Sequence, residues 1–152
     1  MELKIGIVGS RNYPYLEDVD LLVAKIAADT KRQALIVSGG AKGVDKAAET
    51  AALKYGLKVR SYRVASLDDD RHFPELWEFG GAAPQVRVLL EEPCWRDYEA
   101  CLAYRNALII EDSHRIVAFW NRHSSGTSLA LDFAEGAGRP AKIYDLDKRF
   151  LG

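Results

Sequence analysis

The segment Ser38–Glu49 constrains the fold most, because a short apolar run leads there through glycines into a helical pattern. The run before it is Ala34–Val37, and the apolar residues after Gly43 recur every three to four positions. A strand therefore enters a glycine turn that opens directly into a helix N-terminus. Such a turn presents bare backbone N–H groups and the positive end of the helix dipole, which suit a phosphate or a carboxylate. The segment predicts an anion site, although its glycine spacing is neither the P-loop nor the dinucleotide pattern.

The same order of strand, loop and helix recurs along the chain. Short, apolar, branched stretches predict strands over residues 3–8, 34–37, 58–64, 115–120 and 141–144. Amphipathic stretches predict helices over residues 16–27, 44–55 and 98–110, and a fourth that carries apolar residues from 129 to 137. The alternation predicts an α/β fold, a three-layer sandwich with a mostly parallel sheet of about five strands and helices on both faces. A length of 152 residues suits one domain over residues 1–152.

Residues 66–97 interrupt this rhythm with three consecutive acids, three prolines and a glycine pair. The segment has eight acidic residues and three arginines, a charge of −5, so the rest of the chain carries +4 of the total of −1. We expect an insertion made of short helices or a hairpin, with Gln85–Leu90 extended. It is either a packed unit around its own aromatic residues, or a lid or oligomer contact beside the ligand site.

Three loops follow buried strands, and each supplies glycine, hydroxyl groups or both. They contain Gly9, Ser10 and Arg11; Ser38, Gly39, Gly40, Lys42 and Gly43; and Ser124, Ser125, Gly126 and Thr127. In an open parallel sheet, the loops after the strands meet at the carboxyl edge, where ligands bind. Their convergence predicts a phosphate-bearing ligand, whereas one such loop alone would be explained by helix capping or turn chemistry.

Charged residues in the first two loops are candidates for ligand contacts. Arg11 suits bidentate binding of a phosphate, or is a solvated loop cation. Lys42 suits the steering of an anion, or is likewise solvated. Asp45 lies in the first turn of its helix, where it either interacts with the helix dipole or holds ribose hydroxyls.

Two further candidates come from the second half of the chain. Arg105, next to Asn106, lies on an otherwise apolar helical face and so requires an anion or a buried carboxylate. His123 precedes the third loop and is either an acid–base candidate or simply exposed. Catalytic candidates are therefore Arg105, Asp45 and His123. The remaining histidines and the two cysteines lack metal-ligand spacing, so we expect no metal.

The composition indicates the cellular compartment and whether the protein is attracted to nucleic acid or to a membrane. A net charge of −1 exerts no general attraction to nucleic acid or membrane. No apolar run approaches the roughly 18 residues that span a bilayer, and the N-terminus shows no signal-peptide pattern. We expect a cytoplasmic protein with no membrane partner.

The motifs together resemble a known superfamily. In order, the chain contains Gly9–Ser10–Arg11, then S-G-G-A-x-G-V-D over 38–45, then Arg105–Asn106, then Ser125–Gly126–Thr127, and finally Gly138–Arg139–Pro140. This order resembles the Rossmann-type domain shared by bacterial DNA processing protein A and the lonely-guy phosphoribohydrolases, the SLOG superfamily. The match covers nearly all the chain outside 66–97. It implies a Rossmann-like fold, a nucleotide or nucleotide-derived ligand at the three loops, and a homodimer or tetramer.

One departure from the superfamily guides the choice of function. The phosphoribohydrolases resemble P-G-G-x-G-T-x-x-E, whose glutamate serves N-glycosidic cleavage. Here Leu129, Ala130 and Leu131 occupy the positions where that acid would fall, and Asp132 lies further along the helix. The leading hypothesis is therefore a nucleotide-binding sensor or module that requires no cofactor.

Two alternatives remain open. One is a nucleoside-monophosphate phosphoribohydrolase in which Arg105 binds the substrate and Asp45 or His123 replaces the glutamate. The other is single-stranded DNA binding, which the resemblance to DNA processing protein A implies. Nucleic acid is not the favoured partner, because the acidic segment 66–97 repels a phosphate backbone and the basic residues form no evident groove.

Overall fold

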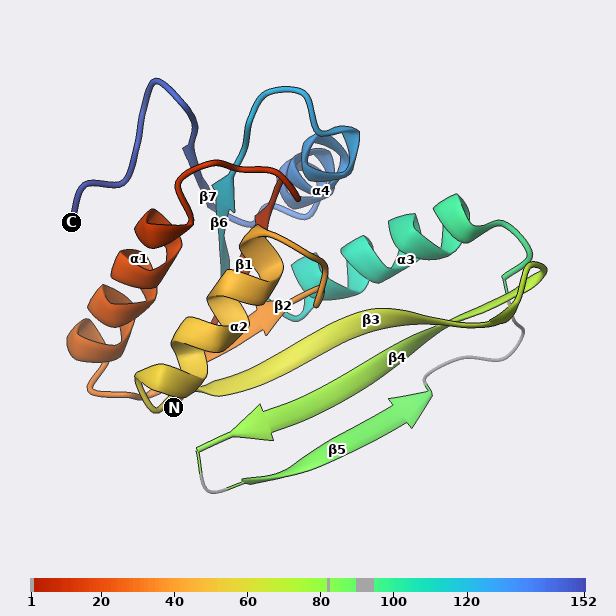
Figure 1. Ribbon diagram of the computed structural model, residues 1–152, viewed down its shortest axis with the longest axis horizontal. Helices are drawn as coiled ribbons and strands as arrows, with labels where there is room; N and C mark the ends of the chain where they lie inside the picture. Colours follow the sequence, from red (N-terminus) through yellow and green to blue (C-terminus); the bar gives the residue numbers. More distant parts are fainter. Residues whose placement is uncertain (1, 82, 90–94) are drawn as a thin grey trace.

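The computed structural model describes residues 2–81, 83–89 and 95–152. Its elements, in chain order, are β1 (Leu3–Gly9), α1 (Leu16–Asp29), β2 (Ala34–Ser38), α2 (Val44–Lys54), β3 (Lys58–Asp68), β4 (Arg71–Gly80), β5 (Ala83–Leu89), α3 (Tyr98–Glu111), β6 (Arg115–Phe119), α4 (Ser125–Gly136) and β7 (Ala141–Tyr144) (Figure 1). None of the helices in this part of the chain is long and apolar enough to cross a membrane.

All of the strands join one sheet in the order β5-β4-β3-β2-β1-β6-β7. Strands β3, β2, β1, β6 and β7 run parallel, and they are the five strands that the sequence predicts. The α/β class with a mostly parallel sheet is therefore confirmed, and β4 and β5 raise the strand count of the sheet to seven. From β1 the chain builds outward to β2 and β3 on one side and to β6 and β7 on the other. This reversal is a topological switch point, where such sheets open a crevice at the carboxyl ends of their strands.

Helices cover both faces of the parallel strands, which makes the predicted three-layer sandwich (Figure 1). One core contains Ile5, Ile7 and Ile36 beneath α1 and α2. The other contains Val8 and Val37 beneath α3 and α4. Alternate residues of one strand enter opposite cores because side chains of a strand alternate between its faces. At the end of α2, Gly56 has a φ of 77° and occupies the C-cap glycine position that the sequence predicts.

The described residues 66–81 and 83–89 of the insertion form a β-hairpin, one of the two forms expected. β3 continues to Asp68, beyond the predicted end at residue 64, and β4 and β5 follow as antiparallel neighbours. Pro74, which the sequence marks as a break, lies within β4 opposite Val64. Among the described residues, pairing of β4 with β5 begins at the next residue, Glu75. The expected extended stretch is largely β5, and residue 90 lies outside the described residues.

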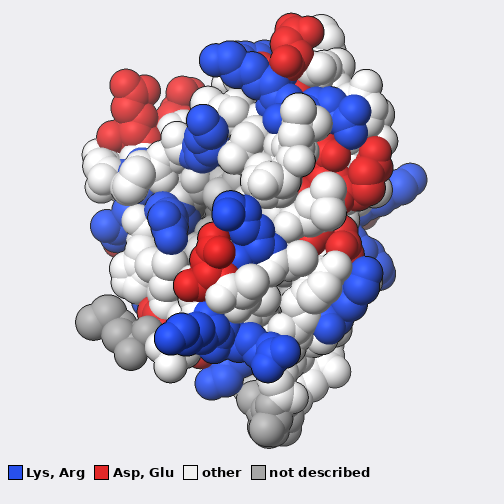
Figure 2. Space-filling model, turned by 90° about the vertical axis from the view of Figure 1, so that its left-hand side faces the viewer, with Lys and Arg blue, Asp and Glu red and all other residues white. Residues whose placement is uncertain are grey.

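Opposite charges are paired on the surface over α1. Lys25 lies 3.2 Å from Asp29, and Arg149 lies 2.9 Å from Asp18. Figure 2 shows basic and acidic side chains interspersed on the side of the molecule that carries α1. Such a surface offers no single-sign field to a highly charged partner.

Candidate functional site

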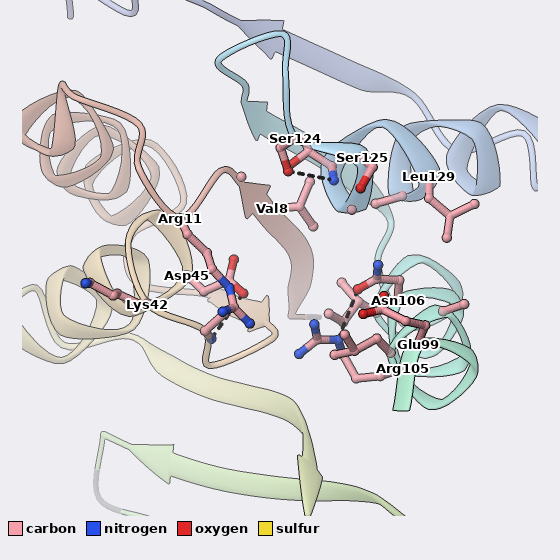
Figure 3. Close-up of a pocket in the computed structure, with 18 of the residues that line it drawn as sticks. Val8, Arg11, Lys42, Asp45, Glu99, Arg105, Asn106, Ser124, Ser125 and Leu129 are labelled. Carbon is pink, nitrogen blue, oxygen red and sulfur yellow. Dashed lines mark hydrogen bonds between the residues drawn. The ribbon is translucent and has the colours of Figure 1, made fainter. Parts of the chain in front are cut away.

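A cleft opens where the strand order reverses, at the carboxyl ends of β1 and β6. Its volume is about 1020 Å³, close to the upper end of the roughly 300–1,000 Å³ typical of ligand pockets. The end of β1 lies at its base, the glycine turn before α2 forms one wall, and α3 forms the opposite wall (Figure 3). The N-terminal turn of α4 completes the enclosure. The three predicted loops therefore meet at one place.

The glycine turn has its shape because two positions accept only glycine. Gly43 has a φ of 87°, and a Cβ there would lie 2.3 Å from the carbonyl oxygen of Arg11. Gly40 has a φ of 68°, and a Cβ there would lie 2.4 Å from Nε of Arg63. The first distance shows how closely the Arg11 loop approaches the start of α2, and the second how closely Arg63 of β3 approaches the turn. A left-handed backbone conformation without side chains is the reason why glycine is needed here.

The two buried serines of the loops do not line the cleft; their hydrogen bonds hold its loops in place. Ser10 is fully buried, and its Oγ accepts a hydrogen bond of 3.1 Å from the backbone N–H of Asn121. This bond ties the first loop to the third. Ser38 is also fully buried; its Oγ accepts from the N–H of Gly40 at 3.4 Å and donates to the carbonyl of Asp45 at 3.4 Å. Neither serine lines the cleft.

The third predicted loop is in fact the first turn of α4. Ser124 is the N-cap, and its Oγ accepts a 3.3 Å hydrogen bond from the N–H of Thr127. Within the described chain, the N–H groups of Ser125 and Gly126 have no such partner, as expected for the first residues of a helix. No atom lies within 4 Å of a Cβ built on Gly126. The turn therefore offers two N–H donors and open space to an anion in the cleft.

Arg105 and Asp45 meet across the carbonyl end of β2. Nη1 of Arg105 donates to the carbonyl oxygens of Gly39 at 2.7 Å and Tyr62 at 3.2 Å. Asp45 Oδ2 accepts from the N–H of Ala41 at 3.2 Å. A Cβ on Gly39 would lie 2.7 Å from Nη1 of Arg105 and 2.8 Å from Oδ2 of Asp45. The absence of a side chain at Gly39 thus lets the guanidinium and the carboxylate approach.

Burial dominates the electrostatics of this pair. It raises the pKa of Asp45 from 3.8 to about 6, and the positive charge of Arg105 acts in the opposite direction. Burial also lowers the pKa of Arg105, against the effect of Asp45. The two side chains form no direct hydrogen bond, so they stabilise each other through charge, and each also bonds backbone groups. The predicted need of Arg105 for an anion is met only in part, and Asp45 changes its charge near physiological pH.

Three further cleft residues carry positive or titratable groups. Arg11 and Lys42 lie on the wall beside Asp45 (Figure 3). Neither forms an ion pair within 4 Å among the described residues, although the charge of Arg11 helps to lower the pKa of Asp45. His123 lines the cleft with an exposed side chain. Its backbone N–H donates to Oδ1 of Asn121 at 2.9 Å. Its role in acid–base chemistry stays a prediction.

Most predicted site residues line the cleft, and some lie behind its walls. The lining residues are Gly9, Arg11, Lys42, Asp45, Arg105, Asn106, His123, Ser124, Ser125, Gly126 and Thr127. Those that shape the turn or the loops without lining the cleft are Ser10, Ser38, Gly39, Gly40 and Gly43. No described residue of 66–89 lines it, so the hairpin does not act as its lid in this structure. No group of metal-ligating side chains is found among the described residues.

Sequence reasoning missed the cleft-facing stripe of α3. Glu99, Leu102 and Ala103 line the cleft together with the predicted Asn106. Their spacing of three, four and seven residues was the available signal, because such positions share one face of a helix. Glu99 belongs to none of the sequence motifs, so the sequence did not single it out.

Comparison with known proteins places the chain in a family. The sequence profile of DNA recombination-mediator protein A matches residues 1–149. The chain belongs to this family. The predicted resemblance to the SLOG superfamily is thereby confirmed. A search of curated proteins finds no match.

Solved structures show the same fold at low sequence identity. DNA processing protein A from Streptococcus pneumoniae superimposes with a TM-score of 0.67 at 19% identity, over 95% of this chain and 50% of that protein. DNA processing protein A from Helicobacter pylori, described with its single-stranded DNA binding mode, superimposes with a TM-score of 0.64 at 24% identity. The match covers 97% of this chain and 68% of that protein. The molybdenum cofactor carrier protein from Chlamydomonas reinhardtii superimposes with a TM-score of 0.59 at 16% identity, over 94% of this chain and 77% of that protein. The chain thus spans about half the length of the pneumococcal protein.

Proposed function

We propose that the chain binds a phosphate-bearing nucleotide, or a derivative of one, in the cleft at the switch point. The observation that carries this proposal is the meeting of two helix N-termini with Arg11, Lys42 and Arg105 in one cleft. Helix N-termini and unpaired cations stabilise the same kind of ligand group, an anion with several acceptor oxygens.

The phosphate would lie between the two helix starts. The N–H groups of Ser125 and Gly126 face the cleft from α4, and Arg11 and Lys42 approach from the opposite wall. A guanidinium such as that of Arg11 matches two phosphate oxygens in a bidentate arrangement. Asp45 would face the ribose hydroxyls or, when protonated, the phosphate itself, since its pKa is raised to about 6.

The cleft supports binding more directly than N-glycosidic cleavage. Leu129 lines the cleft and Asp132 is exposed and does not, so α4 supplies no carboxylate to the site. We therefore propose a sensor or binding module that acts without a cofactor and assembles as a homodimer or homotetramer.

Calorimetric titration with nucleoside mono- and diphosphates tests the proposal. Binding is expected for wild type and is expected to weaken about tenfold or more in Arg11→Met, which removes a charge-assisted contact. Lys142→Met removes a cation from β7, outside the cleft, and should bind as wild type does. Absence of binding to every nucleotide in the panel would refute the proposal.

Single-stranded DNA is a second candidate, because the family match and the described mode of the Helicobacter pylori relative favour it. A groove of about 460 Å³ beside the cleft shares Arg11 and Lys42 with it and adds Lys46. A strand with several phosphates could extend along these cations. Against it, the surface over α1 is mixed in sign (Figure 2).

Fluorescence anisotropy separates the two candidates. A labelled dT oligonucleotide at low and at moderate salt should show an affinity that falls steeply with salt if several phosphates are contacted. Lys46→Met lies in the neighbouring groove only, so it should weaken oligonucleotide binding and leave mononucleotide binding unchanged. Binding of a mononucleotide but not of the oligonucleotide at low salt would exclude the second candidate.

A further inference from the structure

The α3 wall of the cleft carries polar groups that phosphate binding does not use. Glu99 and Asn106 are seven residues apart, so they lie on one face of α3, two turns apart, and both line the cleft. Leu102 lies between them on the same face. An acceptor, an apolar strip and a polar amide thus follow one another along the α3 wall, opposite Arg11 and Lys42 (Figure 3).

The amide of Asn106 is oriented by its neighbour. Nε of Arg105 donates to Oδ1 of Asn106 at 3.0 Å. The guanidinium Nε can only donate, so the atom that faces it is the amide oxygen. The amide nitrogen is then the group left to interact with a ligand, and it can only donate. Arg105 therefore makes Asn106 a hydrogen-bond donor to the cleft.

The carboxylate of Glu99 is an acceptor without a partner. Its backbone N–H is bonded to the N-cap Asp97, but its side chain has no ion pair or hydrogen bond among the described residues. An ionised carboxylate accepts through two oxygens and donates nothing. The neighbouring Tyr98 also lines the cleft, is 40% exposed and supplies an aromatic surface. A flat ring therefore has an apolar or aromatic surface beside this acceptor.

We propose that the α3 wall reads the base of the ligand and selects guanine. The carboxylate of Glu99 accepts from N1–H and the N2 amino group, and the amide nitrogen of Asn106 donates to O6. Leu102 and Tyr98 provide the surface against which the ring lies. This assignment rests on the proposed nucleotide function and adds to it the identity of the base.

Donor and acceptor chemistry excludes the other bases. A carboxylate needs two adjacent donors, and guanine alone presents a ring N–H next to an amino group. Adenine and cytosine place a ring nitrogen acceptor beside their amino group, which would face the second carboxylate oxygen. Uracil and thymine flank their single N–H with two carbonyl oxygens. In each of these cases two lone pairs would oppose each other, which weakens binding.

Titration of the 152-residue chain with GMP, IMP and AMP tests the assignment. The expected affinity order is GMP, then IMP, then AMP, because IMP keeps N1–H and O6 but lacks the amino group. GMP should bind about ten- to hundredfold more tightly than AMP, the discrimination that a good bidentate contact provides. Equal affinities for GMP and AMP would overturn the assignment while leaving nucleotide binding intact.

The isosteric change Glu99→Gln provides a sharper result. Glutamine offers one acceptor and one donor, which match the amino group and ring nitrogen of adenine. The variant should therefore lose GMP affinity about tenfold and gain AMP affinity about tenfold, so that a tenfold preference reverses and a hundredfold preference disappears. Glu111→Gln removes the same charge at the exposed end of α3, outside the cleft, and should bind as wild type does.

Two outcomes separate failure of the assignment from failure of the proposed function. If wild type binds neither GMP nor AMP nor any other nucleotide of the mono- and diphosphate panel, the nucleotide function itself fails. If both bind and Glu99→Gln changes neither, the phosphate site stands and the base-reading role of α3 is wrong. A thermal unfolding curve of Glu99→Gln that coincides with wild type shows that the effect is local, as expected for an exposed side chain without a described partner.

Discussion

The two ends of the sheet differ in how they are covered and in what they can bind. The parallel strands β3, β2, β1, β6 and β7 have helices on both faces, and their loops collect backbone N–H groups and cations into one cleft. The antiparallel strands β4 and β5 lie beyond α1 and α2, and α3 packs against β4 (Figure 1). In the hairpin, charged groups are paired within the surface: Arg87 lies 2.8 Å from Glu75 and over the ring of Trp77.

The comparison of the hairpin with the cleft shows which region keeps charged side chains that form no ion pair. In the hairpin, the acids that make the segment 66–97 negative are partly neutralised by arginines, as in the pair of Asp68 with Arg71 at 2.7 Å. In the cleft, Arg11 and Lys42 have no such acid among the described residues. The two regions meet at Arg63, which bonds Glu49 at 3.0 Å, packs near Gly40 and lies over Trp77. Changes to the cleft should therefore affect ligand binding, and changes to the hairpin only stability.

The largest effect is expected at the glycine turn. Gly43→Ala should lower the free energy of unfolding by about 4 kcal/mol or more, because the new Cβ would collide with a carbonyl 2.3 Å away at a φ of 87°. Urea denaturation measures the loss. Gly126→Ala is the control in the same cleft, since its Cβ meets no atom within 4 Å. It should unfold as wild type does while binding nucleotide more weakly; equal stability of the two variants would contradict the role of the turn.

Removal of the guanidinium of Arg105 should lower the free energy of unfolding by less than Gly43→Ala does. Arg105→Met keeps the length of the side chain but removes the positive charge that acts most strongly on the buried Asp45, and should destabilise the fold by about 3 kcal/mol at pH 8. Part of the loss should be recovered in Arg105→Met combined with Asp45→Asn, as a double-mutant cycle in urea would show. Strictly additive effects would mean that the two residues do not interact.

Asp45→Asn alone should stabilise the protein at alkaline pH. The native pKa of Asp45, about 6, lies above its ordinary value of 3.8, so the native state holds the proton more tightly. Its contribution to stability is therefore present at pH 4, falls as the pH rises to about 6, and stays low above that. The variant should exceed wild type by about 2 kcal/mol at pH 8 and equal it near pH 4. A pH-independent difference between the two would argue against a buried, titrating carboxylate.

The smallest effect is expected in the hairpin. Arg87→Met removes an ion pair between a half-exposed arginine and the buried Glu75, which keeps the 2.7 Å hydrogen bond from Nε1 of Trp77. It also removes a cation–π contact to Trp77, whose centroid lies 5.5 Å away. We expect a loss of about 0.5–1 kcal/mol and unchanged nucleotide affinity. A clear change in affinity would show that the hairpin and the cleft are coupled through Arg63, and would remove the contrast between the two regions.

Local pattern determined much of this protein. The period of the apolar residues predicted the five parallel strands and the helices between them, and the order of glycines and hydroxyls predicted that three loops meet at one edge. These features are readable because strand and helix periods, and the backbone freedom of glycine, are properties of short segments. For the same reason, the sequence alone marks Gly43 and Arg105 as candidate site residues.

The tertiary structure decided which of the predicted residues line the cleft and which support its loops from behind. Ser10 and Ser38 turned out to be buried supports, because the hydrogen bonds that occupy them come from residues distant in sequence or across the turn. The hairpin form of 66–89 depended on pairing with β3, which a segment full of prolines and glycines does not reveal. Glu99 faces the cleft only because α3 packs with that face toward α4 and the glycine turn. Burial, which raises the pKa of Asp45, is likewise a property of the assembled fold and of no local segment.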